Sequence, residues 1–418
     1  MSASRLLYRL LLILMGLPLL LLFIWQGWKG GIGRYPKERL GFVPKRPPHQ
    51  KKPLWFHAAS VGEVNAVIPL LKRFMTAHPE QPILLTTTTI SGFQNAQRRV
   101  PNITHHFLPF DFNHAVQRFL KRIHPKAFFV VETEIWPNLF RECSKQGIPV
   151  EIINGRLSHK SLSSPAWVRR LYRNALTQID NIAARSESDR DAFISLGADP
   201  AKCQTLGNIK YASSTEKERL EPFNEINRPI VVAASTRDGE EQVIATSWRA
   251  ATTDNHLLVI VPRHPERLIE ILKDLARYSI AIRSRGEIPT DKTEIYLADT
   301  FGELKRFMAA SDLVIMGGSF VPQGGQNLIE PAAMGKAIIV GSYMDNFTDE
   351  TQDLLDQQSL VQVTNTDGDA LSQKISVLLK HHQERKRLGK QAEQFVKSHA
   401  NIIERYMAFV EKSISMLN

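Results

Sequence analysis

The chain has few cysteines, and the two that it has stand far apart. Cys143 and Cys203 occur in unrelated contexts and without CxxC spacing. Such a pair indicates neither a framework of disulfide bonds nor a cysteine-based metal site. We therefore expect the folded part of the protein to lie in a reducing compartment.

Two common nucleotide-binding motifs are also missing. The sequence contains no GxxxxGK[ST] segment and no convincing GxGxxG segment, which argues against an NTPase and against a dinucleotide enzyme. Metal signals are weak as well. The DxD strings Asp189-Arg190-Asp191 and Asp367-Gly368-Asp369 stand at an expected helix start and in an expected turn. We expect neither string to bind a metal.

Acidic residues are scarce in the first 52 residues. This segment has ten Lys or Arg residues and one acid, Glu38, so it carries +9 of the chain's net charge of +11. A nucleic-acid-binding protein usually carries its basic charge on the folded domain instead. The distribution therefore predicts contact with anionic lipids at a membrane surface and no nucleic-acid partner.

The same segment contains a long apolar run. The 19 residues between Arg9 and Lys29 carry no charge and are mostly leucine, and as a helix they would span about 28 Å, close to the thickness of a hydrocarbon core. Trp25 and Trp28 stand where interfacial aromatic residues belong. We expect residues 1–30 to be a retained membrane-anchor helix. A cleaved signal peptide and a helix lying in one leaflet are the alternatives.

After the basic segment, short β-branched or aromatic runs alternate with helical stretches such as 64–77 and 113–123. This alternation predicts parallel strands joined by helices. The expected strands are 54–58, 83–87, 127–131, 149–153, 230–234, 257–261, 313–316 and 337–340. A polar stretch divides them into two series, so we expect two doubly wound domains that face a cleft. The predicted domains are 31–211 and 229–418, and the linker between them is 212–228.

A first candidate site lies where the first expected strand gives way to a helix, in the sequence His57-Ala58-Ala59-Ser60-Val61-Gly62-Glu63. Ser60 and Glu63 have the spacing of a capping box, in which both side chains serve only the start of the helix. Alternatively, Glu63 faces the ligand and accepts the proton of an attacking hydroxyl group. A helix amino terminus favours an ionised carboxylate, and a general base must be ionised.

Two further candidates follow later strands of the first domain. Glu132 begins the sequence Glu132-Thr133-Glu134-Ile135-Trp136-Pro137-Asn138 at the carboxyl end of an apolar strand, where doubly wound sheets bind ligands. The alternative is that Thr133 or Glu134 merely starts the next helix. Lys210 ends Gly207-Asn208-Ile209-Lys210 next to the linker. A lone lysine is usually a solvated surface charge. The position of Lys210 next to the linker is the one reason to expect a functional role for it.

Four turns in the second domain suggest a nucleotide site. Small-residue turns between strand and helix expose backbone N–H groups that can hold phosphate, although glycine often serves turn geometry alone. Because four occur in one domain, we expect a nucleotide there, with Arg263 for a phosphate or base and Glu330 for ribose hydroxyls. The turns lie at 234–241, 262–265, 300–304 and 317–331.

Taken in order, these motifs resemble one family, the Kdo transferases, which are inverting glycosyltransferases of the GT-B fold for the acidic sugar Kdo. The resemblance covers nearly the whole chain. The matching motifs are Glu38-Arg39-Leu40-Gly41, SVGE at 60–63, ETEIWPN at 132–138, Asn154 to Ser158, GNIK at 207–210, PRHPER at 262–267 and GGSFVPQGGQNLIEPAA at 317–333. It implies an α/β protein with two Rossmann-like domains facing a cleft.

The resemblance also implies roles for individual residues. Glu63 is then the base for the acceptor hydroxyl, and Glu132 and Lys210 stabilise the transition state. The implied CMP site consists of Pro262, Arg263, Phe301, Gly302, Glu303, Asn327, Leu328, Ile329 and Glu330. The sequence departs from the family pattern at Arg237-Asp238, Gly155, Gln326 and Leu328, and the change at Gln326 alters hydrogen bonding beside the expected CMP.

The implied reaction is transfer of Kdo from CMP-Kdo to a lipid A precursor, lipid IVA, in lipopolysaccharide core biosynthesis, with no metal and no other cofactor. The positive-inside bias places the catalytic domains on the cytoplasmic side of the inner membrane. Another membrane-associated GT-B sugar-nucleotide transferase and a sugar-nucleotide epimerase are the alternative enzymes, and the epimerase would not need a lipid anchor. A membrane-tethered nucleotide sensor would need the second domain but not Glu63.

Overall fold

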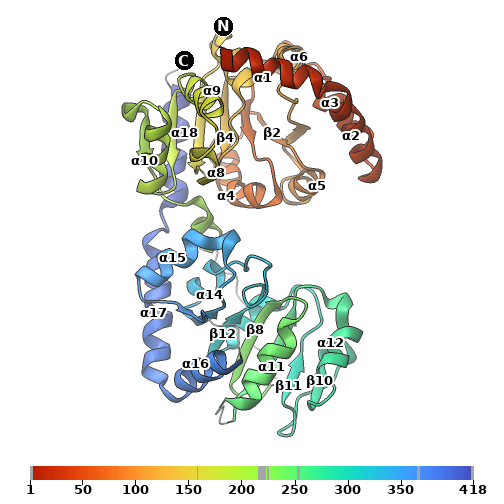
Figure 1. Ribbon diagram of the computed structural model, residues 1–418, viewed down its shortest axis with the longest axis vertical. Helices are drawn as coiled ribbons and strands as arrows, with labels where there is room; N and C mark the ends of the chain where they lie inside the picture. Colours follow the sequence, from red (N-terminus) through yellow and green to blue (C-terminus); the bar gives the residue numbers. More distant parts are fainter. Residues whose placement is uncertain are drawn as a thin grey trace. The chain divides into compact units, whose positions relative to one another are not determined.

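The computed structural model describes residues 3–157, 159–214, 223, 226–251, 255–364 and 368–415. These residues fold into two compact units, both drawn in Figure 1. Unit 1 comprises Met1–Ser213 and Asn401–Asn418, and unit 2 comprises Ser214–Ala400. Ser158, Asp367 and most of the predicted linker 212–228 lie outside the described residues.

Unit 1 is built on a parallel sheet of seven strands in the order β3-β2-β1-β4-β5-β6-β7. The strands are β1 (Leu54–His57), β2 (Ile83–Thr87), β3 (Thr104–Phe107), β4 (Ala127–Val131), β5 (Val150–Gly155), β6 (Asn181–Ala184) and β7 (Cys203–Thr205). The chain runs outward from β1 to β3 and restarts at β4, on the other side of β1. Such a reversal opens a crevice at the carboxyl ends of the central strands, where ligands bind. The loops after β1 and β4 therefore flank the expected ligand site.

Helices cover both faces of this sheet, so its strands are buried on both sides. Leu54 and Phe56 lie in one core, and Trp55 between them lies in the other, because successive side chains of a strand point to opposite faces. This double burial explains why the strands read as continuous apolar runs. The helices are α3 (Tyr35–Arg39), α4 (Val61–Ala77), α5 (Ile90–Arg99), α6 (Asn113–Ile123), α7 (Pro137–Lys145), α8 (His159–Leu162), α9 (Ala166–Leu176) and α10 (Glu187–Leu196).

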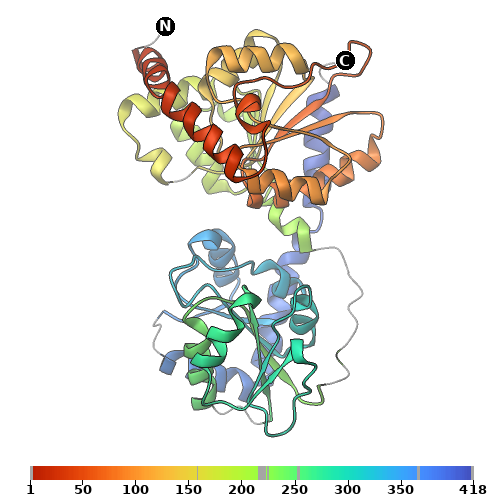
Figure 2. The same ribbon diagram turned by 90° about the vertical axis from the view of Figure 1, so that its right-hand side faces the viewer.

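The last helix of the chain, α18 (Ile402–Ser415), also belongs to unit 1. It packs against α4, and its Tyr406 and Val410 are buried in the core that contains Leu54 and Phe56. Figure 2 shows this helix in blue beside the sheet of unit 1. The structure thus corrects the predicted domain 229–418 at its end. Residues from 401 onward fold with the first domain because their apolar face completes its core.

Unit 2 repeats the plan with a parallel sheet of seven strands in the order β10-β11-β9-β8-β12-β13-β14. The strands are β8 (Ile230–Thr236), β9 (Leu257–Pro262), β10 (Ile280–Ile282), β11 (Ile295–Leu297), β12 (Leu313–Met316), β13 (Ala337–Val340) and β14 (Val361–Gln362). Here the reversal lies between β8 and β12. The helices are α11 (Glu240–Ala250), α12 (Leu268–Asp274), α13 (Leu304–Ala310), α14 (Ile329–Ala333), α15 (Thr348–Asp356), α16 (Gly368–Lys380) and α17 (His382–Ser398). Two doubly wound units confirm the predicted fold class.

The apolar amino-terminal segment forms two helices, whereas one anchor helix was predicted over residues 1–30. α1 (Ala3–Leu14) and α2 (Gly16–Lys29) meet at a bend of 54°. Pro18 accounts for the break, because it has no N–H for the carbonyl of Leu14. Among the described residues, no single helix is long and apolar enough to cross a membrane, and this bent pair qualifies by length and composition alone.

Candidate active site

Glu63 lies in the first turn of α4, directly after β1, and both of the roles considered for it fit its contacts. Its N–H donates to the Ser60 hydroxyl oxygen at 3.4 Å, so Ser60 caps the helix. The carboxylate accepts hydrogen bonds from the Ser60 hydroxyl at 3.0 Å and from the N–H of Ala59 at 2.7 Å. The capping box is therefore formed, and its geometry also fixes the carboxylate at the carboxyl end of β1.

Glu132 follows β4 on the other side of the crevice and pairs with Lys210. The two side chains approach to 3.4 Å between the Glu132 Oε1 and the Lys210 Nζ. Glu132 has a φ of 62°, a left-handed conformation that is uncommon for a residue with a side chain and occurs preferentially at functional sites. The helix α7 begins at Pro137, so the alternative that Thr133 or Glu134 starts that helix is wrong.

The charge of Glu132 also reaches Glu63. Burial and the nearby negative charge of Glu132 raise the pKa of Glu63 to about 8, and Glu134 adds to this effect. The structure therefore brings Glu63, Glu132 and Lys210 together in one region of unit 1. The expectation that the helix terminus keeps Glu63 ionised is corrected, because burial and like charge outweigh the helix dipole.

His57 and Glu134 belong to the same cluster, although the sequence analysis gave neither a role. His57 is fully buried, and its Nδ1 lies 3.0 Å from the Thr86 Oγ1. Its Nε2 lies 3.8 Å from the Glu134 Oε2. Burial acts to raise the pKa of Glu134, but His57, Trp136 and Arg39 outweigh it and hold that pKa below its usual value. The sequence contained a signal for His57, since it is the last residue of the first strand and such positions border the ligand site.

The loop that carries Lys210 is held by two other parts of unit 1. Asn154 lies near the end of β5, where the strand pairing is irregular, and has a φ of 54°. Its Oδ1 accepts a hydrogen bond from the N–H of Ile209 at 3.0 Å. The hydroxyl of Tyr406 on α18 donates to the carbonyl of Gly207 at 2.8 Å. The last helix of the chain thus positions the residues that precede Lys210, a role that no local sequence pattern indicates.

In unit 2, the predicted nucleotide residues share one edge of the sheet. Pro262 ends β9, the segment 301–303 follows β11, and the segment 327–330 follows β12. β11 and β9 are adjacent, and β8 alone separates β9 from β12, so these residues follow strands at the centre of the sheet. Arg263 is anchored by its N–H, which donates to the carbonyl of Thr236 at 3.0 Å, while its side chain is exposed. This edge is where a doubly wound sheet binds nucleotides.

One of the glycine-rich turns is occupied by a side chain of the protein itself. The carboxylate of Glu240, buried at the start of α11, accepts hydrogen bonds from the N–H groups of Gly318 at 2.6 Å and Phe320 at 2.8 Å. It also accepts one from the N–H of Arg237 at 2.8 Å. Two of these donors belong to the turn 317–331 and one to the turn 234–241. All three are satisfied internally, so the expectation that such N–H groups are offered to a phosphate is corrected for Gly318, Phe320 and Arg237.

The segment 301–303 presents an aromatic ring and an ion pair. Phe301 is 81% exposed, which is unusual for a large apolar residue and leaves its ring free to stack on a planar group. Gly302 has a φ of 88°, a conformation that favours glycine. Glu303 is bound by Arg283 at 2.9 Å, and this hydrogen bond lowers the pKa of Glu303. Glu303 is therefore an ionised acceptor at the predicted site.

The segment 327–330 contributes mainly through its backbone. The side chains of Leu328 and Ile329 are buried in the core, so these two predicted residues can meet a nucleotide through their main chain alone. The Oδ1 of Asn327 accepts a hydrogen bond from the N–H of Ile329 at 3.0 Å and orders the turn before α14. Glu330 lies in the first turn of this helix and is half-buried.

The DxD string of unit 1 has a structural task. Asp189 is bound by Arg185 at 2.8 Å and by the Ser186 hydroxyl at 2.7 Å, and its own N–H donates to that hydroxyl oxygen at the start of α10. The second string begins with Asp367, which lies outside the described residues. Among the residues that are described, no group of three or more His, Cys, Asp or Glu side chains could hold a metal ion.

Comparisons with known proteins identify the family of this chain. Residues 34–213 match the family model of 3-deoxy-D-manno-octulosonic-acid transferase (Kdo transferase). The transferase of that name from Haemophilus influenzae is 35% identical over 364 residues, which cover 84% of this chain and 85% of that protein. The one from Bordetella pertussis is 32% identical over 361 residues, which cover 81% of this chain and 83% of that protein.

A solved structure supports the fold. A putative UDP-N-acetylglucosamine 2-epimerase from Listeria monocytogenes matches with a TM-score of 0.60 and 13% identity, covering 88% of this chain and 97% of the other. At this identity the likeness shows the two-domain GT-B type of architecture and nothing of the reaction. The family model matches residues 34–213, which contain the loops of Glu63, Glu132 and Lys210, and the two sequence relatives each match more than four-fifths of the chain. The chain therefore belongs to the family of 3-deoxy-D-manno-octulosonic acid transferases and is a glycosyltransferase.

Proposed function

We propose that this glycosyltransferase moves Kdo from CMP-Kdo to a sugar hydroxyl of a lipid A precursor, lipid IVA, with inversion at the anomeric carbon. The observation that carries the proposal is the cluster of Glu63, Glu132 and Lys210 at the reversal point of the unit 1 sheet. The names of the relatives support Kdo as the transferred sugar.

The chemistry of the cluster suits an inverting displacement. The acceptor oxygen forms a bond to the anomeric carbon of Kdo while the bond from that carbon to the CMP phosphate oxygen breaks, and CMP leaves with the electron pair. Glu63 accepts the proton of the attacking hydroxyl group. With a pKa of about 8, it is a stronger base than an ordinary glutamate, and enough of it is ionised near neutral pH.

Lys210 supplies positive charge near the reacting groups, and Glu132 holds its ammonium group at 3.4 Å. Kdo is itself anionic, and its leaving group is a monophosphate ester. We propose that Lys210 and the donors of the CMP site stabilise this charge without a divalent metal.

For the donor we propose the edge of unit 2 already described. Arg263 has an exposed guanidinium group for the phosphate or base, Phe301 offers a ring for stacking, and Glu330 reaches for ribose hydroxyls. Gly302, Glu303 and the backbone of 327–329 complete the proposed CMP site, which Pro262 borders.

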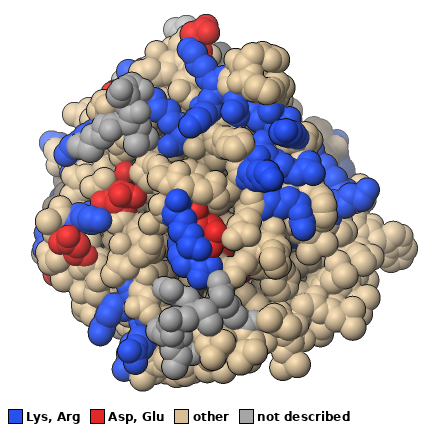
Figure 3. All heavy atoms as spheres, turned by 90° about the horizontal axis from the view of Figure 1, so that it is seen from above, with Lys and Arg blue, Asp and Glu red and all other residues tan. Residues whose placement is uncertain are grey.

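We further propose that the protein works at the cytoplasmic face of the inner membrane and touches its anionic lipids. The exposed apolar residues of α1 and α2 support this, as does a basic surface formed by residues 45–52 and α6. The two parts of this surface are joined by the N–H of Arg46, which donates to the carbonyl of Arg122 at 2.9 Å. Figure 3 shows Lys and Arg side chains gathered over one part of unit 1, with few acidic ones beside them.

The proposal is tested with the purified full chain, CMP-Kdo and lipid IVA in detergent micelles, with EDTA or with magnesium ions. We expect a Kdo-bearing lipid at similar rates in both reactions. If wild-type protein makes no such lipid, the proposed reaction is wrong. If EDTA abolishes the activity and magnesium ions restore it, the metal-free mechanism is wrong.

A further inference from the structure

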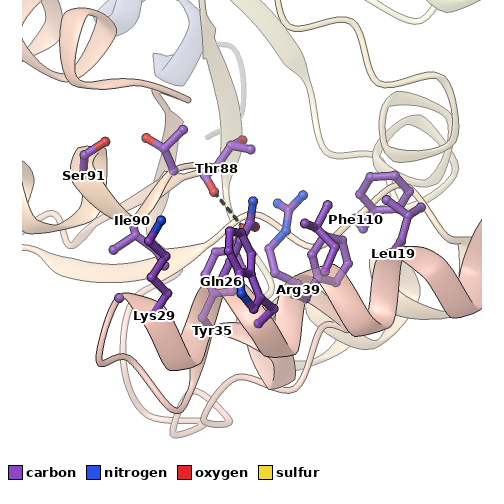
Figure 4. A pocket seen from close by; sticks show the side chains of 14 residues that line it. Leu19, Gln26, Lys29, Tyr35, Arg39, Thr88, Ile90, Ser91 and Phe110 are labelled. Carbon is purple, nitrogen blue, oxygen red and sulfur yellow. Dashed lines mark hydrogen bonds between the residues drawn. The ribbon is translucent and has the colours of Figure 1, made fainter.

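A pocket of about 500 Å³ lies in unit 1 between α2 and the loops that follow β2 and β3. Figure 4 shows side chains of α2 facing Thr88, Ile90 and Ser91 across it. The volume is in the range of small-molecule sites. Its wall is largely apolar and is formed by Leu19, Leu22, Phe23, Trp25, Ile90 and Phe110.

The helix α2 carries apolar residues on two faces. Leu19, Leu22 and Phe23 line the pocket. Leu17, Leu21, Ile24 and Trp28 recur at helical spacing on another face and are 50–81% exposed. If this outer face enters the lipid, as proposed above, α2 forms a wall between the bilayer and the pocket. A lipid tail could then reach the pocket from the bilayer without passing through water.

Two buried polar atoms on the lining residues have no partner within the described part of the chain. They are the Nε of Arg39 and the Oγ1 of Thr88. Arg39 is 2% exposed, and its guanidinium group lies over the rings of Phe23 and Phe110. Both atoms can donate a hydrogen bond, and a buried donor without a partner is costly. An ester or amide carbonyl is an acceptor that would satisfy them.

The pocket is connected directly to the proposed base. The N–H groups of Thr88 and Thr89, two lining residues, each donate to the carbonyl of Ala59 at 3.1 Å. The N–H of Ala59 donates in turn to the Glu63 carboxylate at 2.7 Å. One residue, Ala59, therefore connects the pocket wall to the base, so a ligand in the pocket would keep its head group close to Glu63.

We propose that this pocket binds one fatty acyl chain of the acceptor lipid, with its ester or amide carbonyl at Arg39 and Thr88. The proposal rests on the function proposed above and names the part of the acceptor that unit 1 recognises. Lys29, exposed at the pocket rim, provides a positive charge for the anionic head group. The contact between the pocket wall and Ala59 favours the acceptor over a lipid of the surrounding bilayer, which has no reason to lie next to the base.

Neighbouring leucines of α2 give a matched test. Leu22 lines the pocket and is 41% exposed, whereas Leu21 lies on the outer face and is 59% exposed. We would measure kcat/KM in detergent micelles for Leu22→Glu and Leu21→Glu, with the acylated acceptor and with a fully deacylated acceptor. Leu22→Glu should lower kcat/KM about tenfold or more for the acylated acceptor alone, because several methylene groups lose their apolar contact. Leu21→Glu alters only the outer face of α2, so it should leave the ratio of the two values within about twofold of that of wild type.

A second variant approaches the pocket from the other side. Ser91 is exposed and lies on α5, so Ser91→Trp fills the pocket without any change to the residues of α2. It should reproduce the selective loss seen with Leu22→Glu. Equal losses for both acceptors, or no loss in either pocket variant, would overturn the acyl-chain site while leaving Kdo transfer intact. If wild-type protein transfers Kdo to neither acceptor, the proposed function itself fails.

Discussion

At the scale of single residues, two carboxylates in one small region of unit 1, Glu63 and Glu134, have pKa values shifted in opposite directions. Glu63 has a raised pKa because it is buried beside Glu132, while Glu134 has a lowered pKa because His57, Trp136 and Arg39 outweigh its burial. Environments that push the pKa values of neighbouring acids apart are typical of catalytic sites. In the proposed mechanism, Glu63 is the proton acceptor and Glu134 remains a fixed negative charge.

This arrangement predicts the pH dependence of the reaction. Because a base must be deprotonated and the pKa of Glu63 is about 8, kcat/KM should rise with pH and level off above about 8. Glu132→Gln removes a negative charge that raises this pKa and leaves Lys210 nearby, so the rise should move to lower pH even though the rate falls. The measurement is kcat/KM as a function of pH for both proteins.

Glu187→Gln is the control for this experiment, because Glu187 is exposed on α10 and interacts with Arg190. Its profile should match that of wild type. A profile of Glu132→Gln that stays in place or moves to higher pH would contradict the proposed coupling between the two carboxylates.

At the scale of elements, the long apolar runs were predictable and the positioning contacts were not. All eight strands expected from sequence are present, because burial on both faces leaves a continuous apolar signal. Missed strands such as β7 and β10 have three residues each, too few for a pattern. The hydrogen bonds from Tyr406 to Gly207 and from Gly318 to Glu240 connect segments that are distant in the sequence. No local sequence pattern predicts such contacts.

The contact of α18 with the Lys210 loop can be tested with Tyr406→Phe. This change keeps the buried ring but removes the hydrogen bond to the carbonyl of Gly207, which should cost about 1 kcal/mol of unfolding free energy. Because the loop carries Lys210, kcat should also fall, while the affinity of unit 2 for CMP should stay unchanged. Urea denaturation, steady-state kinetics and calorimetry measure the three quantities. An unchanged kcat would limit α18 to a role in stability.

The turn after β12 can be tested with Glu240→Ala. Three N–H groups lose the carboxylate that accepts their hydrogen bonds, so the unfolding free energy should fall by about 3 kcal/mol or more. Affinity for CMP should weaken as well, since the turn adjoins the segment 327–330. Glu266→Ala, at a side chain that is 67% exposed, is the control and should change stability by less than about 0.5 kcal/mol. Equal stability of the two variants in denaturant would contradict the role of Glu240.

At the scale of the whole molecule, the chain crosses between its two units twice. It leaves unit 1 near residue 213, and it returns at residue 401 so that α18 can complete the first core. The prediction of two doubly wound domains is confirmed, because each series of strands and helices has its own alternating pattern in the sequence. The tail was assigned to the domain that precedes it in the sequence. This was wrong, because the pattern of an amphipathic helix does not indicate which core the helix covers.

The amino-terminal segment shows the same limit. Its apolar run and basic flank were plain in the sequence, and they predicted contact with lipid. Pro18 explains the bend before α2, but the packing of Phe23 against Tyr35 and Phe110 depends on tertiary contacts. These contacts help to form the pocket beside the proposed base, and they link the apolar amino-terminal segment to the proposed catalytic site.

The central claim is that Glu63 accepts the proton when Kdo is transferred to a lipid acceptor. The most direct test is mass spectrometry of lipid IVA after incubation with CMP-Kdo and either wild-type protein or Glu63→Gln, with circular dichroism to confirm that both are folded. Wild type should convert the lipid to species heavier by whole Kdo residues, and Glu63→Gln should leave it unchanged over the same period. Substantial conversion by a folded Glu63→Gln protein would contradict the claim and leave Glu63 with its helix-capping role alone.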